Sequence, residues 1–231
     1  MKKVLAVIPA RKGSKRIKNK NLLLLNGKPL IYYTIKAAKE SKYVDDWLVS
    51  SDSDEIIKVA KFFKAPVYFK RPKSLSGDQV RNAEVMIHAL EYMEEKKKIK
   101  YDYIFLLQPT SPFRKKNDID KAIKLLVDSK LESIASVRGP YEKKDPNLKR
   151  INKKGDLVDY KRIKKNQFEP FYIYNASIYG IRKNSLLKNR KFVTKKQIPF
   201  IMNEIHSVDI NDEHDILLAK ALVQRLNKYE K

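Results

Sequence analysis

The 231-residue sequence contains no cysteine and has only three histidines. Without cysteine there can be no disulfide, no thiolate metal site and no cysteine nucleophile. The histidines, His88, His206 and His214, are too isolated to form a zinc site, and His88 lies on the inner face of a predicted helix, where we expect it to pack. The lack of cysteine is compatible with the cytoplasm, and we expect a cytoplasmic protein.

Long apolar segments and the common glycine-rich motifs are also missing. No apolar run reaches the roughly 18 residues that a membrane-spanning helix needs. The opening MKKVLAVIPA resembles a signal peptide, but its apolar stretch is short and continues directly into a cationic loop, so we reject that interpretation. Neither GxxxxGK(S/T) nor GxGxxG occurs, which excludes both common classes of phosphate-binding loop.

Acidic residues are few relative to basic ones. The chain has 27 Asp and Glu against 51 Lys and Arg, a formal net charge of +24 at pH 7. Such a charge suits a polyanionic partner or a small, highly anionic substrate. Because the lysines are spread along the whole chain, the charge as a whole is also explained by a solvated surface. The cations clustered between residues 11 and 20 need a separate explanation.

Apolar runs alternate with helical patterns along most of the chain. Extended segments are predicted at 4–8, 22–25, 47–49, 67–69, 103–107, 134–137 and 172–181. Helices are predicted at 29–38, 53–63, 83–93, 118–127 and 212–226. Strands separated by such helices predict an α/β protein with a mostly parallel sheet flanked by helices, here as one domain over residues 1–231.

The alternation breaks at residues 138–170, which are highly charged and show little helical periodicity. This segment is either a disordered insertion or a hairpin-containing arm that reaches out of the domain.

The segment IPARKGSKRIKNKN, residues 8–21, follows the first predicted strand and holds six cations within ten residues. In open α/β sheets, ligands bind beyond the carboxyl ends of the strands, where this loop must lie. The backbone at Gly13 and Ser14 can turn N–H groups toward phosphate oxygens, and Arg11 and Lys20 can neutralise them. We therefore favour a triphosphate site over a solvated basic loop or a nucleic-acid contact.

Two further motifs lie later in the chain. In LLQPTSPFR, residues 106–114, two prolines constrain the backbone, which fits a binding site and a rigid strand-to-helix turn equally well. In VDINDEHD, residues 208–215, Asp212 and Asp215 have the spacing of a helix N-cap and its acidic partner. Asp209 has no such role, and near an anion site it suggests Mg²⁺, which takes one or two carboxylates plus substrate phosphates.

Together these segments resemble the acylneuraminate cytidylyltransferases, or CMP-sialic acid synthetases, a family that includes the legionaminic and pseudaminic acid enzymes. The family patterns IPARxGSKxIxxKN and QPTSPxR are present at residues 8–21 and 108–114. Weaker matches occur at Arg71-Pro72, at 175–179 and at 209–211. The resemblance runs nearly end to end and implies a Rossmann-like nucleotide-diphospho-sugar transferase fold.

The resemblance also implies a reaction: Mg²⁺-dependent transfer of CMP from CTP to the anomeric hydroxyl of a nonulosonic acid, a nine-carbon 2-keto sugar acid, with release of pyrophosphate. It assigns CTP binding to Arg11, Gly13, Ser14, Lys20, Asn21 and Arg71, sugar binding to Gln108, Asn175 and Tyr179, and metal binding to Asp209, Asn211 and Asp212. Lys20, Asp209 and Arg11 would be catalytic. Residues 138–170 would form a basic dimerisation arm of a homodimer.

Three departures from the family pattern concern the metal shell and the sugar. Asn211 replaces an acidic residue, so that Asp212 or a water would complete the shell. Asn-Ala-Ser at 175–177 replaces Asn-Gly-Ala, and Lys165-Asn166 replaces an arginine pair in the arm. The sequence does not choose among sialic, legionaminic and pseudaminic acids. The alternatives are a cytidylyltransferase for the eight-carbon sugar Kdo and, from the charge, a nucleic-acid-binding protein, although no known module supports the latter.

Overall fold

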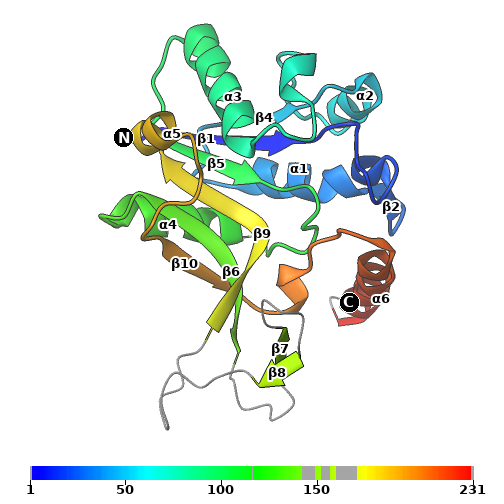
Figure 1. Ribbon diagram of the computed structural model, residues 1–231. Coiled ribbons are helices and arrows are strands. Elements are labelled where there is room, and N and C mark those ends of the chain that lie inside the picture. The colour runs from blue at the N-terminus through cyan, green and yellow to red at the C-terminus, as the bar shows by residue number, and fades with distance from the viewer. Residues whose placement is uncertain (1, 116, 142–148, 152–156, 160–170, 230–231) are drawn as a thin grey trace.

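The structure, a computed structural model, describes residues 2–115, 117–141, 149–151, 157–159 and 171–229. A six-stranded sheet in the order β10-β6-β9-β5-β1-β4 forms its centre (Figure 1). Within this sheet β9 is antiparallel to both neighbours, and the other pairs are parallel, which confirms the predicted architecture. The strands are β1 (Val4–Pro9), β4 (Asp46–Ser50), β5 (Tyr103–Leu107), β6 (Ser133–Tyr141), β9 (Phe171–Arg182) and β10 (Ile198–Met202).

Helices cover the sheet on both faces, as predicted. They are α1 (Leu30–Glu40), α2 (Asp54–Phe62), α3 (Asn82–Lys97), α4 (Asp118–Asp128), α5 (Lys183–Asn189) and α6 (Glu213–Tyr229), of which the sequence did not predict α5. Among the residues that the structure describes, no helix has both the length and the apolar composition needed to cross a membrane.

Several short elements differ from the sequence prediction. Residues 22–25 do not form one strand, because a 3-10 turn at Lys20–Leu22 precedes the two-residue strand β2 (Leu24–Leu25), which pairs with β3 (Lys28–Pro29). Residues 67–69 form no strand. The unpredicted strand β10 contains a proline, which an edge strand tolerates because one side of its backbone needs no partner.

Alternate side chains of β1 divide the core into two layers. Val4, Ala6 and Ile8 pack in a cluster with residues of α1, α2 and α4. Leu5 and Val7 point to the other face and pack with residues of α3 and α5. A strand buried on both faces must be apolar throughout, which explains why the run at the start of the chain shows no polar alternation.

A third, smaller apolar cluster joins the cationic loop to the end of the chain. It contains Ile17 and Leu25 from the segment after β1, Val208 and Ile210 from the segment before α6, and Ala219 from α6 itself. Figure 1 shows α6 standing beside β2, away from the central sheet. The cluster therefore holds the loop that follows β1 against the segment that carries Asp209.

The order of the strands places a topological switch point at the carboxyl end of β1. The chain passes from β1 through α1 to β4 on one side, and then crosses to form β5 on the other side of β1. At such a switch point the loops that leave the two strand ends diverge, and ligands bind between them. The loops at issue are residues 10–21 after β1 and 108–113 after β5.

Only part of the predicted arm at 138–170 lies among the described residues. Within it, β7 (Lys149–Ile151) pairs antiparallel with β8 (Leu157–Asp159) as a separate two-stranded sheet. Figure 1 shows this hairpin apart from the central sheet, beyond the end of β6. The hairpin favours the second interpretation of the segment, while a role in dimerisation stays a prediction.

Gly180 lies in β9 between its two register partners, Phe105 on β5 and Ile134 on β6. A Cβ at this position would stand 2.5 Å from the Phe105 ring and 2.8 Å from Ile134 Cγ2. We expect Gly180→Ala to lower the free energy of unfolding by about 1–3 kcal/mol, the usual cost of overpacking. Gly77→Ala is the control, because its nearest new contact would lie at an ordinary 3.9 Å. Denaturant unfolding measures both, and equal stability of the two variants would contradict this packing.

Candidate active site

A cavity of about 290 Å³ opens at the carboxyl ends of β1 and β5. The described residues that line it are Arg11, Ser14, Lys15, Arg16, Lys20 and Asn21 from the first loop and Gln108, Pro109 and Thr110 from the second. Four of these side chains are cationic and none is a carboxylate, so the cavity is suited to a multiply charged anion.

The cavity brings together five of the predicted site residues: Arg11, Ser14, Lys20, Asn21 and Gln108. Gly13 lies in the same loop, next to Ser14. The remaining predicted residues, namely Arg71, Asn175, Tyr179, Asp209, Asn211 and Asp212, do not line this cavity.

The shape of the first loop depends on Asn19 and Asn21. Asn19 adopts the left-handed conformation with a φ of 53°, which asparagine tolerates better than most residues. The buried Asn21 donates a hydrogen bond from Nδ2 to the carbonyl oxygen of Arg11 at 3.0 Å. This bond closes the loop on itself, so Asn21 has a structural role in addition to the base-reading role that the family pattern predicts.

Lys20 connects the first loop to the segment before α6. Its Nζ donates to the carbonyl oxygen of Ile210 at 2.8 Å, and the Ile210 N–H donates to the Thr110 carbonyl oxygen at 2.8 Å. Burial lowers the pKa of Lys20, and the nearby carboxylate of Asp209 opposes this change. Two hydrogen bonds thus join the loop after β1, the loop after β5 and the segment before α6, which together hold most of the predicted site.

Asp209 has one carboxylate oxygen engaged and one unpaired. Its Oδ2 accepts a hydrogen bond from Asn211 Nδ2 at 2.7 Å, whereas Oδ1 is buried and has no hydrogen-bond partner. Buried polar atoms are nearly always paired, so this unpaired carboxylate oxygen is the candidate ligand atom of Asp209.

The surroundings of Asp209 suit a Mg²⁺ ion held partly by substrate phosphates better than a metal ion held by protein side chains alone. In the part of the chain that the structure describes, no group of three or more His, Cys, Asp or Glu side chains is placed to hold a metal ion. Mg²⁺ is commonly bound by one or two carboxylates together with substrate phosphates, so a lone carboxylate beside an anion cavity suits it.

Asp212 and Asp215 form the start of α6, which confirms the capping pattern. The Asp215 N–H donates to Asp212 Oδ1 at 3.1 Å. In return, Asp215 Oδ2 accepts from the N–H groups of Asn211 at 2.7 Å and Asp212 at 3.1 Å. The Asp212 carboxylate therefore already has a local partner, unlike Oδ1 of Asp209, and its role as a metal ligand stays a prediction.

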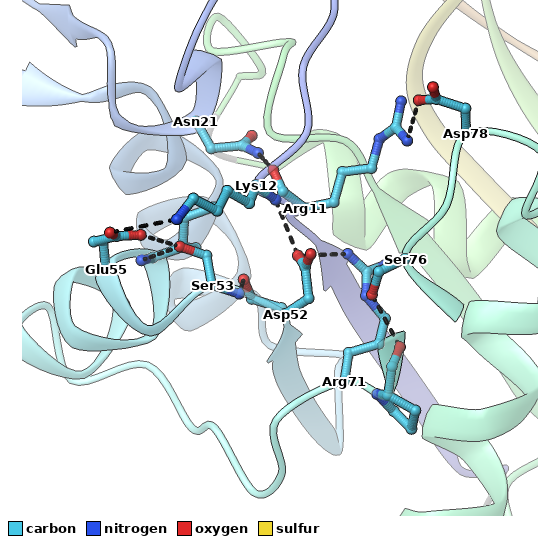
Figure 2. A network of polar contacts seen from close by, with 12 residues as sticks. Arg11, Lys12, Asn21, Asp52, Ser53, Glu55, Arg71, Ser76 and Asp78 are labelled. Atoms are coloured by element: carbon cyan, nitrogen blue, oxygen red, sulfur yellow. Dashed lines mark hydrogen bonds and ion pairs between the residues drawn. The ribbon is translucent and has the colours of Figure 1, made fainter. Parts of the chain in front are cut away.

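Arg71 is buried beside the cationic loop with unused hydrogen-bond donors. Its guanidinium lies 3.7 Å from Asp52 Oδ1, which also accepts from the Lys12 N–H at 2.9 Å (Figure 2). Burial lowers the pKa of Arg71, while Asp52 favours the charged form. The Nε and Nη2 atoms are buried without a hydrogen-bond partner. Nη2 is the atom that faces Asp52, so Nε is the donor left without any partner and is available to an acceptor atom of a ligand.

Arg11 and Lys15 both contact the carboxylate of Asp78. Arg11 Nη1 lies 2.6 Å from Asp78 Oδ1, and Lys15 Nζ lies 2.8 Å from Oδ2. Lys15 and, to a lesser extent, Arg11 lower the pKa of Asp78. Figure 2 shows Arg11 extended toward Asp78, away from Asp52. Exposed ion pairs of this kind contribute little to stability, so an anionic ligand could take over both cations at small cost.

The predicted sugar-binding residues Asn175 and Tyr179 lie on β9, the neighbour of β5. Asn175 is buried; its Nδ2 donates to Ser207 Oγ at 2.8 Å and its Oδ1 accepts from the Ser177 N–H at 3.2 Å. Burial raises the pKa of Tyr179, and the neighbouring Tyr174 and Asp209 add to this effect. Both residues are therefore near the Asp209 side of the site, but outside the cavity that contains Gln108.

A bulge in β9 determines where Asn175 lies. Ala135 pairs with Tyr179 and Val137 pairs with Tyr174, so two steps along β6 (135 to 137) correspond to five along β9 (179 to 174). Within the bulge Ala176 has a φ of 58°, in the left-handed region. Bulges of this kind often redirect side chains next to active sites.

Sequence reasoning missed several residues of the site. Lys15 and Arg16 belong to the cation cluster, which was a visible signal, and they line the cavity. Asp52 follows β4 and Asp78 precedes α3, and neither lies in a pattern that identified it as a partner of the cationic loop. His88 was expected to pack in the interior, and its ring does contact that of Phe69 edge-on, with the two ring centroids 4.7 Å apart.

Comparisons with known proteins identify the class of this enzyme. Residues 5–225 match the family model described as cytidylyltransferase, which defines a nucleotidyltransferase. The chain is 35% identical to the CMP-N,N'-diacetyllegionaminic acid synthase of Legionella pneumophila, over 96% of this chain and 97% of that one. It is 30% identical to the pseudaminic acid cytidylyltransferase of Campylobacter jejuni, over 95% and 96% of the two chains. The chain therefore belongs to the acylneuraminate cytidylyltransferase family, as the motifs indicated.

Two other comparisons concern length and fold. The chain is 32% identical to the N-acylneuraminate cytidylyltransferase of Escherichia coli over 98% of its own length, but it spans only about half of that relative, 53%. A solved CMP:2-keto-3-deoxy-manno-octonic acid synthetase in complex with CTP superposes with a TM-score of 0.69 at 17% identity, covering 96% of this chain and 99% of that one. This likeness confirms the predicted transferase fold.

The left-handed conformation of Ala176 predicts a stabilising substitution. An L residue in this region costs roughly 1–2 kcal/mol, which glycine avoids, although glycine also has more freedom in the unfolded chain. We expect Ala176→Gly to raise the free energy of unfolding by about 1 kcal/mol. The control Ala37→Gly, inside helix α1, is expected to lower it by about 1 kcal/mol. Loss of stability in both variants, measured by denaturant unfolding, would contradict the strain at Ala176.

Proposed function

We propose that this protein transfers CMP from CTP to the anomeric hydroxyl of a nonulosonic acid in a Mg²⁺-dependent reaction that releases pyrophosphate. The observation that carries the proposal is the cation-lined cavity at the switch point, next to the unpaired carboxylate oxygen of Asp209. The names of full-length relatives, a legionaminic acid synthase and a pseudaminic acid cytidylyltransferase, support an acceptor of the nine-carbon class.

The cations of the cavity would receive the triphosphate. In the reaction the anomeric hydroxyl gives up its proton to a nearby base or to water, and its oxygen bonds to the α-phosphorus. The bond from that phosphorus to the bridging oxygen breaks, so negative charge gathers on the leaving pyrophosphate. Such transfers depend mainly on positioning and charge neutralisation. Arg11 and Lys20 line the cavity, and Lys20 is already held by the Ile210 carbonyl, so it needs little reorganisation to act on the phosphates.

Asp209 would hold Mg²⁺ through Oδ1, with Asn211 or Asp212 and the substrate phosphates as further ligands. When bound, Mg²⁺ supplies additional neutralisation of the phosphate charge. Asn211 Nδ2 donates to the other oxygen of Asp209, which orients the carboxylate. In this arrangement Asn211 supports the Asp209 carboxylate whether or not its own side-chain oxygen also binds the metal.

Arg71 would contact the cytosine base. The ring of cytosine presents a carbonyl oxygen and a ring nitrogen as adjacent acceptors. Two buried donors of Arg71, Nε and Nη2, make no hydrogen bond, although Nη2 lies 3.7 Å from Asp52 Oδ1. Asp52 keeps the guanidinium next to the cationic loop. Base and triphosphate would then be bound by adjacent parts of the same site.

Three further parts of the proposal rest on the sequence and on the family resemblance. We propose that residues 1–231 act as one catalytic domain, that residues 138–170 are a dimerisation arm of a homodimer, and that the protein is cytoplasmic. No membrane or nucleic acid partner is required for the proposed reaction.

The substrate pair is tested by pyrophosphate release in the presence of Mg²⁺. Four nucleoside triphosphates are each combined with sialic, legionaminic and pseudaminic acids and with Kdo. We expect release only with CTP and one of the nine-carbon acids. Release with CTP and Kdo alone would replace the proposed acceptor. If the protein instead bound DNA tightly, with steep salt dependence and no competition by CTP, the nucleic-acid alternative would be favoured.

Asp209 is tested by removing its charge. We expect Asp209→Asn to lower kcat by about 10²–10³-fold, because the buried unpaired oxygen would lose its affinity for the cation. The control Asp54→Asn changes an exposed carboxylate in the first turn of α2 and should leave kcat unchanged. Asp212→Asn keeps a good N-cap, so a large loss there would assign Asp212 to the metal shell. Magnesium titrations accompany each assay, and wild-type kcat in Asp209→Asn would exclude Asp209 from the mechanism.

A further inference from the structure

Arg114 lies at the end of the QPTSPFR motif and has a partly buried side chain with hydrogen bonds to three different elements. Its Nε and Nη2 donate to the Ser177 carbonyl oxygen at 3.1 and 2.9 Å. Nη2 also donates to the Gln108 carbonyl oxygen, and Nη1 donates to Thr34 Oγ1 at 2.9 Å. The guanidinium therefore joins the ends of β5 and the β9 bulge to helix α1.

The hydrogen bonds of Arg114 lie where the backbone pairing between β5 and β9 ends. The register between β5 and β9 ends with Leu107 opposite Ile178. Beyond that pair the contact continues as one long backbone hydrogen bond, from the Gln108 N–H to the Ser177 carbonyl oxygen at 3.4 Å. Arg114 contacts both the Gln108 and the Ser177 carbonyl oxygens, so its planar fork of donors sets the distance between the two chains at the start of the bulge.

The two carbonyl groups belong to the acceptor side of the proposed site. Gln108 lines the cavity, and Ser177 donates its N–H to the side chain of Asn175. Both Gln108 and Asn175 are assigned to the sugar by the family pattern. The residues assigned to CTP come from the loop after β1 and from Arg71, and none of the hydrogen bonds of Arg114 goes to them.

Thr34 contacts both Arg114 and the Gln108 carbonyl oxygen. It is fully buried in α1, accepts from Arg114 Nη1, and donates its own hydroxyl hydrogen to the Gln108 carbonyl oxygen at 3.2 Å. The Gln108 carbonyl oxygen is therefore held by two side chains. This leaves little freedom for the backbone from which the Gln108 side chain extends.

We propose that Arg114, supported by Thr34, is a positioning residue that sets the place of Gln108 relative to Asn175 and thereby controls recognition of the acceptor sugar. The inference rests on the proposed function. It predicts that disturbing Arg114 changes the KM for the sugar acid while the KM for CTP stays nearly constant. A residue that only stabilised the fold would lower the thermal stability without separating the two constants.

The test uses two variants of this arrangement and one matched control. Arg114→Lys keeps the charge but loses the fork, and Thr34→Val removes one hydroxyl with little change of shape. The control is Arg182→Lys, because Arg182 also donates to two carbonyl oxygens, those of Leu131 and Ser129, but lies at the other end of the β5–β9 pair. Initial rates are measured with each substrate varied in turn, and thermal unfolding is recorded for every variant.

We expect Arg114→Lys to raise the KM for the sugar acid about tenfold, the usual effect of losing a buried hydrogen bond, and to change the KM for CTP less than about twofold. Thr34→Val should act in the same direction with a smaller effect. Arg182→Lys should lower the thermal stability without changing the ratio of the two KM values.

Two results would overturn the inference. One is an unchanged ratio of the KM values in Arg114→Lys with wild-type activity in the same assay, and the other is an equal rise of both constants. If Arg114→Lys does not fold, Thr34→Val decides, and an unchanged KM for the sugar acid in that variant overturns the inference. If the wild-type protein releases no pyrophosphate with any substrate pair, the proposed function fails first and the inference falls with it.

Discussion

The hydrogen bond from Lys20 to the carbonyl oxygen of Ile210 is the interaction on which the site depends. It connects a loop near the start of the chain to a segment about 190 residues later, and the apolar cluster around Ile17 and Ile210 supports the same connection. Together these contacts place the cations after β1 and the carboxylate of Asp209 in one site. Because Lys20 is desolvated there, its pKa falls, which is the electrostatic cost of placing a cation where it can meet a phosphate.

The few acidic residues near the site organise its many cations. Asp52 faces Arg71 and the Lys12 N–H, Asp78 holds Arg11 and Lys15, and Asp209 acts on Lys20. Asp78 keeps two cations close together that would otherwise repel one another, and Asp52 and Asp209 each favour the charged form of one cation. The large net charge therefore has two explanations. Around the cavity, cations are gathered into a site by neighbouring carboxylates, whereas elsewhere the charge is compatible with an ordinary solvated surface.

The sequence predicted the long, buried elements best. The strands at 4–8 and 103–107 were found because a central parallel strand is buried on both faces and reads as an uninterrupted apolar run. Elements stabilised mainly by their neighbours were missed. Helix α5 is short and mostly polar, and β10 contains a proline that only an edge position permits. The same limit applies to the site, where Asp52 and Asp78 act through contacts with residues 40 and 67 positions away.

By itself the sequence determined the fold class, the cationic loop, the family and the capping pair Asp212 and Asp215, because each depends on composition or on residues close together in the chain. Only the tertiary structure decided which acid of the 208–215 segment keeps an unpaired oxygen and where Arg114 donates. A cap forms within one helical turn, so its spacing is visible in the sequence. Whether a buried polar atom is paired depends on groups that only folding brings near, and no local pattern records them.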